Sequence, residues 1–141
     1  MRRLFLSSTL LVMTSLAFAP ASAIAGKKIS PKKINGAITV DASKAKQLFD
    51  KGVVFIDVRK DKDFAAGRVP DAIHIELKKV YSKNTLGKAV SMDQPVVIYC
   101  NGHSCTRSAK AAEKAVSWGY KNVYYFRDGF PSWKSSGYPV E

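Results

Sequence analysis

Residues 96–107 read Val96-Val97-Ile98-Tyr99-Cys100-Asn101-Gly102-His103-Ser104-Cys105-Thr106-Arg107, an apolar run that passes into a polar loop. The apolar run consists of β-branched and aromatic residues, which is typical of a strand buried on both faces of a parallel sheet. Beyond the loop, Ala111, Ala115 and Trp118 recur at helical spacing. The stretch therefore predicts a strand at 96–99, a loop and a helix, with Cys100 at the carboxyl end of the strand.

The same alternation of strand and helix continues on both sides of this stretch. Asp41 has the side chain of a helix N-cap, apolar residues follow it at helical spacing, and Gly52 is a typical helix end. Further strands are predicted at 38–40, 53–56, 72–76 and 123–126, helices at 61–66 and 130–135, and a helix with a loop within 77–92. Alternating strands and helices predict an α/β domain with a largely parallel central sheet.

Residues 1–25 have the layout of a secretory signal peptide. Arg2 and Arg3 give a basic start, and the residues from Leu4 to Phe18 are mostly apolar. Small residues then form two cleavage patterns, which predict cleavage after Ala23 or Ala25. The apolar part is shorter than the roughly 20 residues that span a membrane. We therefore expect a protein exported to the bacterial periplasm, with no stable membrane anchor after cleavage.

The remaining chain is long enough for one domain. Residues 26–36 are rich in lysine with nothing to bury, so they predict a flexible basic lead, and residues 37–141 form the domain. The net charge of +12 favours small anions and acidic partners. Because the lysines are spread without a dense basic run, we expect no nucleic-acid binding. No cofactor is expected, and one histidine between two cysteines matches no strong zinc spacing, so no metal is expected.

The polar loop places a thiol where open α/β sheets bind ligands, outside the carboxyl ends of the strands. Loop amides at a helix N-terminus can cradle an anion, and Gly102 allows the tight turn that this requires. The helix dipole and Arg107 favour the nucleophilic thiolate of Cys100. Cys100 can alternatively be an inert buried residue. The combination of strand end, glycine loop, arginine and helix start favours a reactive cysteine.

Three stretches of the domain resemble the rhodanese-like domain family. They are Phe55-Ile56-Asp57-Val58-Arg59 with Phe64 and Gly67-Arg68-Val69-Pro70-Asp71-Ala72 downstream; Val97-Ile98-Tyr99-Cys100 with Arg107-Ser108-Ala109; and Asp128-Gly129-Phe130-Pro131-Ser132-Trp133 with Gly137-Tyr138-Pro139-Val140. The resemblance implies a three-layer α/β/α fold with a mainly parallel five-stranded central sheet. It also implies that Cys100 carries a persulfide, and that the loop amides bind the sulfane sulfur and an anionic donor such as thiosulfate.

The loop is longer than the family pattern. Loops of the family usually place four residues between the cysteine and the residue that closes the loop, and related phosphatase loops place five. Here six residues separate Cys100 from Arg107. Thr106 or Ser104 can therefore close the cradle in place of Arg107. The candidate substrate-binding residues are Asn101, Gly102, His103, Ser104, Thr106 and Arg107.

Other polar residues are interpreted as structural. The resemblance implies that Asp57 and Arg59 are mostly architectural. His103 is interpreted as a solvated loop histidine, and His74 as a structural residue within a strand. Cys105 can be a small packing residue, a resolving thiol that attacks a Cys100 persulfide, or a disulfide partner. A curled loop would bring the two cysteines within the roughly 4.4 to 6.8 Å between Cα atoms that a disulfide requires.

These features favour a thiosulfate-type sulfurtransferase. The Cys100 thiolate would take a sulfane sulfur from a small anionic donor and pass it to a thiol or protein acceptor. The alternative is a binding or redox-partner module with the same fold and low turnover, because the wide loop would have lost the donor geometry. A phosphatase or arsenate reductase comes third, since its loop needs five intervening residues.

Overall fold

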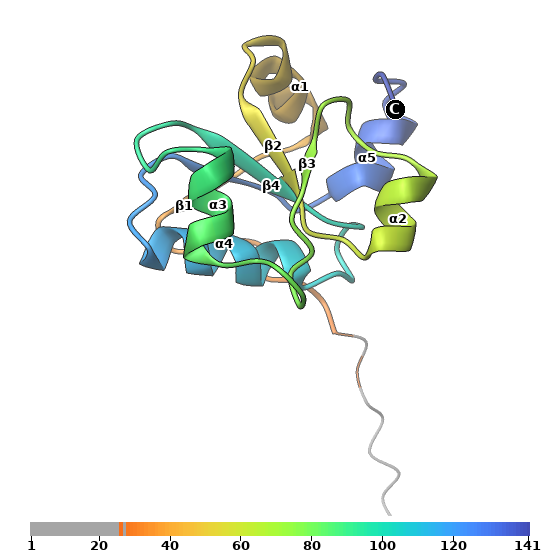
Figure 1. Ribbon diagram of the computed structural model, residues 1–141. Helices are drawn as coiled ribbons and strands as arrows, with labels where there is room; N and C mark the ends of the chain where they lie inside the picture. The colour runs from red at the N-terminus through yellow and green to blue at the C-terminus, as the bar shows by residue number, and fades with distance from the viewer. Residues whose placement is uncertain (1–25, 27) are drawn as a thin grey trace, which may run out of the picture.

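The computed structural model describes residues 26 and 28–141, so the predicted signal peptide lies outside the described residues. Strands and helices alternate along most of the chain (Figure 1). In chain order they are β1 (Ala37–Thr39), α1 (Ala42–Asp50), β2 (Val54–Asp57), α2 (Asp61–Ala66), β3 (Ile73–His74), α3 (Lys83–Ala89), β4 (Val96–Tyr99), α4 (Arg107–Ser117), β5 (Val123–Phe126) and α5 (Gly129–Ser135). Within the described part of the chain, no helix is long and apolar enough to cross a membrane.

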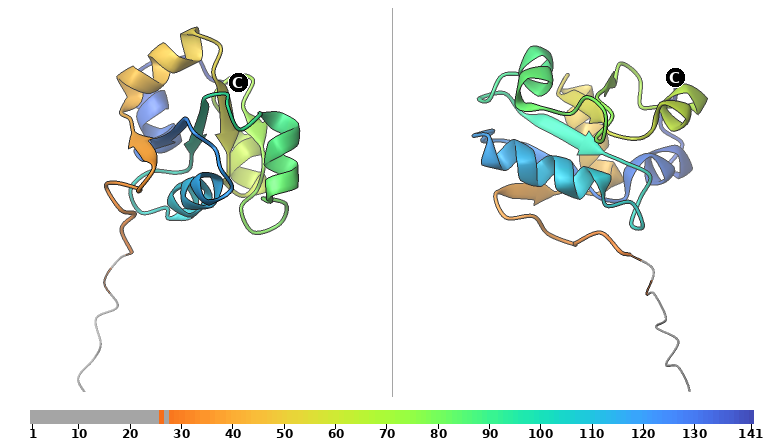
Figure 2. Two further views of the ribbon diagram at one scale, coloured as in Figure 1. Left: turned by 90° about the vertical axis from the view of Figure 1, so that its left-hand side faces the viewer. Right: turned by 60° about the horizontal axis from the view of Figure 1, so that its bottom comes forward.

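The five strands form one parallel sheet in the order β1-β5-β4-β2-β3. Helices α1 and α5 lie together on one face of the sheet, and α3 and α4 lie on the other (Figure 2). The structure thus confirms the predicted three-layer α/β/α fold with a five-stranded parallel sheet. Strand β4 is central, so its carboxyl end is flanked by the ends of β5 and β2.

Strand β4 is buried on both faces, as its continuous apolar run predicts. Alternate side chains point to opposite faces of a strand. Val96, Ile98 and Cys100 accordingly pack into the core beneath α3 and α4, whereas Val97 and Tyr99 pack into the core beneath α1 and α5. The side chain of Cys100 therefore points to the face of the sheet that α3 and α4 cover.

Local signals in the sequence predicted most helices and strands at nearly the positions that the structure shows. The Asp41 side chain accepts a hydrogen bond from the amide of Lys44 at 2.8 Å, which confirms the predicted cap of α1. The strand expected at 72–76 is shorter, because regular pairing of β3 with β2 covers only Ile73 and His74. The amide of Ile75 still donates to the carbonyl of Asp57 at 2.9 Å, so the segment continues along β2 in an irregular form.

The lead differs from the sequence-based expectation. Residues 26–36 were expected to have nothing to bury, and this is wrong for Ser30 and Ile34, which are 2% and 5% exposed. Ile34 belongs to the core beneath α4, and the carbonyl of Pro31 accepts a hydrogen bond from the hydroxyl of Tyr125 at 3.1 Å. The physical reason is tertiary packing, because two isolated isoleucines among lysines give no periodic signal, and only Ile34 is buried.

Candidate active site

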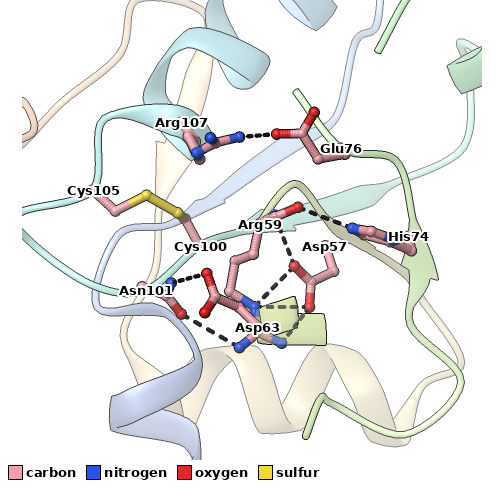
Figure 3. The surroundings of a disulfide bond; sticks show 9 residues. All are labelled: Asp57, Arg59, Asp63, His74, Glu76, Cys100, Asn101, Cys105 and Arg107. Carbon is pink, nitrogen blue, oxygen red and sulfur yellow. Dashed lines mark hydrogen bonds and ion pairs between the residues drawn. A yellow bond between two sulfur atoms is a disulfide. The ribbon is translucent and has the colours of Figure 1, made fainter. Parts of the chain in front are cut away.

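The loop after β4 is closed by a disulfide between Cys100 and Cys105 (Figure 3). Their Cα atoms are 6.3 Å apart, within the range expected for a curled loop. Cys100 is fully buried, whereas Cys105 is only partly buried. Because neither sulfur is a free thiol in this form, nucleophilic chemistry at Cys100 first requires reduction of the disulfide.

The curl of the loop depends on two glycines. Gly102 has φ +100°, a conformation that favours glycine, and its carbonyl accepts the amide of Cys105 at 2.9 Å. Gly129 begins α5 directly against the loop, and a Cβ there would overlap the carbonyl oxygen of Cys100. That carbonyl accepts the amide of Phe130 at 2.9 Å. In the disulfide form, the amide of Cys105 is therefore used within the loop and does not point into an anion cradle.

The end of the neighbouring strand β2 holds a buried ion pair. The guanidinium of Arg59 donates to both carboxylate oxygens of Asp57, with Nε–Oδ1 at 2.9 Å and Nη2–Oδ2 at 2.6 Å. The hydroxyl of Tyr99 donates to the same carboxylate at 2.7 Å, and Arg59 also donates to the carbonyl of Gly67 at 2.7 Å. The carboxylate, the guanidinium and the phenol thus all have hydrogen-bond partners inside the protein, as expected of buried groups with an architectural role.

The pKa values of this cluster follow from its burial and charges. Burial opposes the charge of Arg59, but the hydrogen bond and the charge of Asp57 outweigh it and raise the pKa of Arg59 above its ordinary value. Burial, with the nearby Asp57 carboxylate, raises the pKa of Tyr99 well above its ordinary value. The cluster therefore keeps an ionised arginine and a protonated phenol across the physiological range.

Asn101 joins this cluster to the cysteine loop. Its side-chain oxygen accepts from Nη1 of Arg59 at 3.3 Å, and its side-chain nitrogen donates to the carboxylate of Asp63 at 3.1 Å (Figure 3). The residue directly after Cys100 is thus held between β2 and the start of α2. This arrangement gives Asn101 a positioning contact rather than a free side chain for a ligand.

Arg107 points away from the other loop residues. Its guanidinium is paired with the carboxylate of Glu76, a side chain that is 4% exposed (Figure 3). Burial raises the pKa of Glu76, but the hydrogen bond and charge of Arg107 outweigh it, so the pKa lies below its ordinary value. Arg107 lines a separate hollow with Lys60, Lys62 and other residues. The wide loop thus places Arg107 at the start of α4 and outside the mouth of the loop.

The other candidate residues of the loop fall into two groups according to whether they line a hollow. Asn101, Gly102, His103 and Ser104 line one hollow of about 940 Å³, whereas Thr106 does not line it and directly precedes α4. His103 is exposed, as expected for a loop histidine, and its ring pairs with the carboxylate of Asp128. The structure therefore brings residues 101–104 together and separates them from Thr106 and Arg107.

Sequence reasoning missed several of the contacting residues. Glu76, Asp63 and Arg127 were not singled out, and Asp128 was quoted only within a family-like stretch, without a contact to the loop. The position of Asp128 just after the last strand was an available signal, because the carboxyl ends of parallel strands meet at one edge. Glu76 gave no comparable signal, since β3 is an edge strand that is not adjacent to β4.

Comparison with known proteins places this architecture in a family. The family model for the rhodanese-like domain matches residues 41–136. A thiosulfate sulfurtransferase GlpE of Pseudomonas savastanoi pv. phaseolicola is 31% identical over 103 residues, which cover 72% of this chain and 91% of the relative. Another GlpE, of Pseudomonas fluorescens, is 33% identical over 98 residues, covering 69% and 84%. The BH2092 protein of Bacillus halodurans superposes with a TM-score of 0.66 at 26% identity, covering 74% of this chain and 77% of that one.

Proposed function

The chain belongs to the rhodanese-like domain family, and from this premise we propose that it is a sulfurtransferase that carries a sulfane sulfur as a persulfide on Cys100. The observation that carries the proposal is the position of Cys100. It lies at the carboxyl end of the central strand, in a glycine-containing loop that leads into α4. The GlpE relatives, named as thiosulfate sulfurtransferases, support thiosulfate as the donor.

The chemistry requires the reduced loop. A dithiol reductant first exchanges with the disulfide, which gives two cysteine thiols and leaves the reductant as a disulfide. The Cys100 thiolate then attacks the outer sulfur of thiosulfate, forms a new sulfur–sulfur bond and releases sulfite with the electron pair of the broken bond. An acceptor thiolate finally takes the outer sulfur from the persulfide, and Cys100 returns as a thiolate.

Intact-mass measurement tests this function. The protein is reduced, freed of reductant and incubated with thiosulfate, and it should then gain the mass of one sulfur atom. Cys100→Ser should show no gain, whereas Cys105→Ser should still gain it, which makes Cys105→Ser the matched control. Absence of an adduct with thiosulfate and with other sulfane donors would overturn the proposal.

A redox-partner module with low turnover is a second candidate, and the disulfide favours it. In the oxidised loop Cys100 is fully buried, and the amide of Cys105 is bonded to Gly102 rather than open to an anion. Steady-state turnover with thiosulfate and cyanide separates the two functions. Rapid turnover by the reduced protein supports the sulfurtransferase, whereas activity only in the presence of a dithiol protein partner supports the module.

Export to an oxidising compartment is also part of the proposal. The layout of residues 1–25 supports it, and an oxidising compartment is where a disulfide such as Cys100–Cys105 persists. The mass spectrum of the protein recovered under non-reducing conditions reports both the cleavage site and the state of the cysteines. A precursor of full length with two free thiols would contradict export.

A further inference from the structure

A hollow of about 430 Å³ lies where the start of α2, the segment that follows β3 and the start of α4 meet. Every side chain that lines it is charged: five are cations and two are carboxylates. Sites for small organic molecules are mostly apolar, so the composition of this hollow does not fit such a ligand. It fits the charged surface of another protein.

Both carboxylates of the hollow already have partners inside it. Asp61 forms an ion pair with Lys79. Glu76 forms an ion pair with Arg107, and its Oε2 accepts a hydrogen bond from the amide of Lys78 at 3.0 Å. The two carboxylates therefore offset only two of the five cations.

Three exposed lysines supply the excess positive charge of the hollow. Lys60, Lys62 and Lys78 form no ion pair with any carboxylate of residues 28–141. The nearby carboxylate of Asp63 does not line the hollow and accepts a hydrogen bond from the side chain of Asn101 instead. Because exposed charges act over roughly 8 Å at physiological ionic strength, the hollow attracts an acidic protein surface and repels a basic one.

The disulfide lies beside this hollow. Cys105 comes two residues before Arg107, and two residues of chain span at most about 7 Å. A transient redox complex buries roughly 500 Å² on each partner, so one footprint covers both the hollow and Cys105. Cys105 is partly exposed, whereas Cys100 is 0% exposed. An incoming thiolate therefore meets the disulfide from the Cys105 side.

We propose that the hollow docks an acidic dithiol protein, which opens the disulfide by attack on Sγ of Cys105. The partner's thiolate forms a bond to this sulfur, the Cys100–Cys105 bond breaks, and its electron pair goes to Sγ of Cys100. The partner's second thiol then gives its proton to water and attacks the partner's own sulfur in the mixed disulfide. Cys105 leaves as a thiolate and takes a proton from water, so the partner ends as a disulfide and this protein as a dithiol.

This order of attack deepens the proposed function, on which the proposal rests for its purpose. The first exchange sets Cys100 free as the thiolate that takes up the sulfane sulfur, while Cys105 still holds the partner. Docking and exchange themselves need no sulfur donor. They are therefore measured apart from persulfide formation.

Two synthetic dithiol peptides test the docking. Each contains two cysteines separated by two residues, with four flanking glutamates in one peptide and four flanking glutamines in the other. Acid quenching and intact-mass measurement give the rate constant for reduction of the oxidised protein, and rates with bis(2-hydroxyethyl) disulfide correct for the reactivity of the peptide thiols. At low salt the glutamate peptide should react about tenfold faster. The advantage should vanish at about 1 M salt, where the screening length is about 3 Å.

Lys78→Gln should reduce the advantage of the glutamate peptide about threefold, because one steering charge is lost. Lys51→Gln is the matched control: it changes the net charge equally, but Lys51 is exposed at the end of α1 and does not line the hollow. It should leave the advantage unchanged. Equal rates for the two peptides, or equal effects of the two substitutions, would overturn docking at the hollow.

A single-cysteine form of the glutamate peptide tests the site of attack, because its mixed disulfide has no second thiol to resolve it. Peptide mapping after an early acid quench should find the peptide on Cys105 and a free thiol at Cys100. The peptide on Cys100 would overturn attack at Cys105. Since no sulfur donor is present, failure of the reduced protein to gain sulfur from thiosulfate would overturn the proposed function alone and leave these results intact.

Discussion

Strands β2 and β4 are paired along their length, with Asp57 opposite Tyr99, and both carry polar residues at their carboxyl ends. At the end of β2, the charges of Asp57 and Arg59 are buried and bonded within the protein. At the end of β4, the chain turns into an exposed loop whose polar residues border a hollow. The difference separates architecture from chemistry, because groups that already have partners in the core are not available to a ligand.

The largest effect on stability is expected from removing the buried ion pair at the carboxyl end of β2. Asp57→Ala leaves the guanidinium of Arg59 buried without its counter-charge, and the loss of one partner of a buried ion pair costs about 3 to 5 kcal/mol. Denaturant unfolding measures this loss in the free energy of unfolding. Asp50→Ala, which removes an exposed partner of Lys46, is the control and should cost less than about 0.5 kcal/mol. Similar losses for both variants would remove the distinction between the strand ends.

At the β4 end, the next largest effect is that of the disulfide. Cys105→Ala opens a short loop, and the chain-entropy estimate for such a loop is about 2 kcal/mol. The loss of stability should appear under oxidising conditions and disappear when both proteins are compared in a reductant. Unfolding curves with and without the reductant measure it.

The same variant tests whether Cys105 is a resolving thiol. If Cys100 carries the proposed persulfide, Cys105 of the wild type can attack its inner sulfur, which releases hydrosulfide and forms the disulfide. Cys105→Ala should therefore keep its persulfide longer and resist oxidative inactivation. Mass spectra taken over time follow both species. If the wild type and Cys105→Ala lose activity equally fast under oxidation, Cys105 has only a packing role.

A smaller effect, with a defined pH dependence, is expected at the start of α4. Glu76→Gln removes the negative partner of Arg107 and should cost about 1 to 2 kcal/mol at neutral pH. Because the pKa of Glu76 is lowered in the folded protein, its stabilisation is complete above the unfolded value of about 4.5 and is lost as the pH falls through the folded value. The difference in unfolding free energy between the wild type and Glu76→Gln should therefore close below pH 4.5.

Glu113→Gln is the control for this pH series, because Glu113 is exposed on α4. Its difference from the wild type should stay small at every pH. A gap for Glu76→Gln that widens towards acid would contradict the assignment of a stabilising ionised Glu76.

The two strand ends also show what the sequence could predict. The apolar runs of β2 and β4, the cap at Asp41 and the glycine in the loop are local signals, and they located the elements and Cys100. The partners of the loop are not local: Arg107 meets Glu76 across 31 positions, and Arg59 meets Asn101 across 42. Such pairs depend on strand order and side-chain direction. The buried position of Ile34 in the lead likewise depends on tertiary packing that no periodic pattern encodes.

The smallest effect on stability is expected from cutting the link between the two ends. Asn101→Ala removes the contacts of its side chain with Arg59 and Asp63, but Asn101 is exposed, so the cost in stability should be below about 1 kcal/mol. The effect on sulfur transfer should be larger, because the residue after Cys100 would no longer be held against β2. A small displacement of a reacting group is enough to slow a reaction, so kcat should fall about threefold to tenfold.

The Michaelis constant for thiosulfate separates positioning from binding in this variant. If Asn101 positions Cys100 and does not touch the donor, KM should stay within about twofold while kcat falls. Asn122→Ala is the matched control, because Asn122 is also exposed and bonds through its side chain, to the carbonyl of Asp93 at 3.2 Å, without any contact to the loop. It should cost similar stability and leave kcat unchanged. Equal kcat values for the two variants would show that the ordered end of β2 does not act on the loop, and the two strand ends would then work independently.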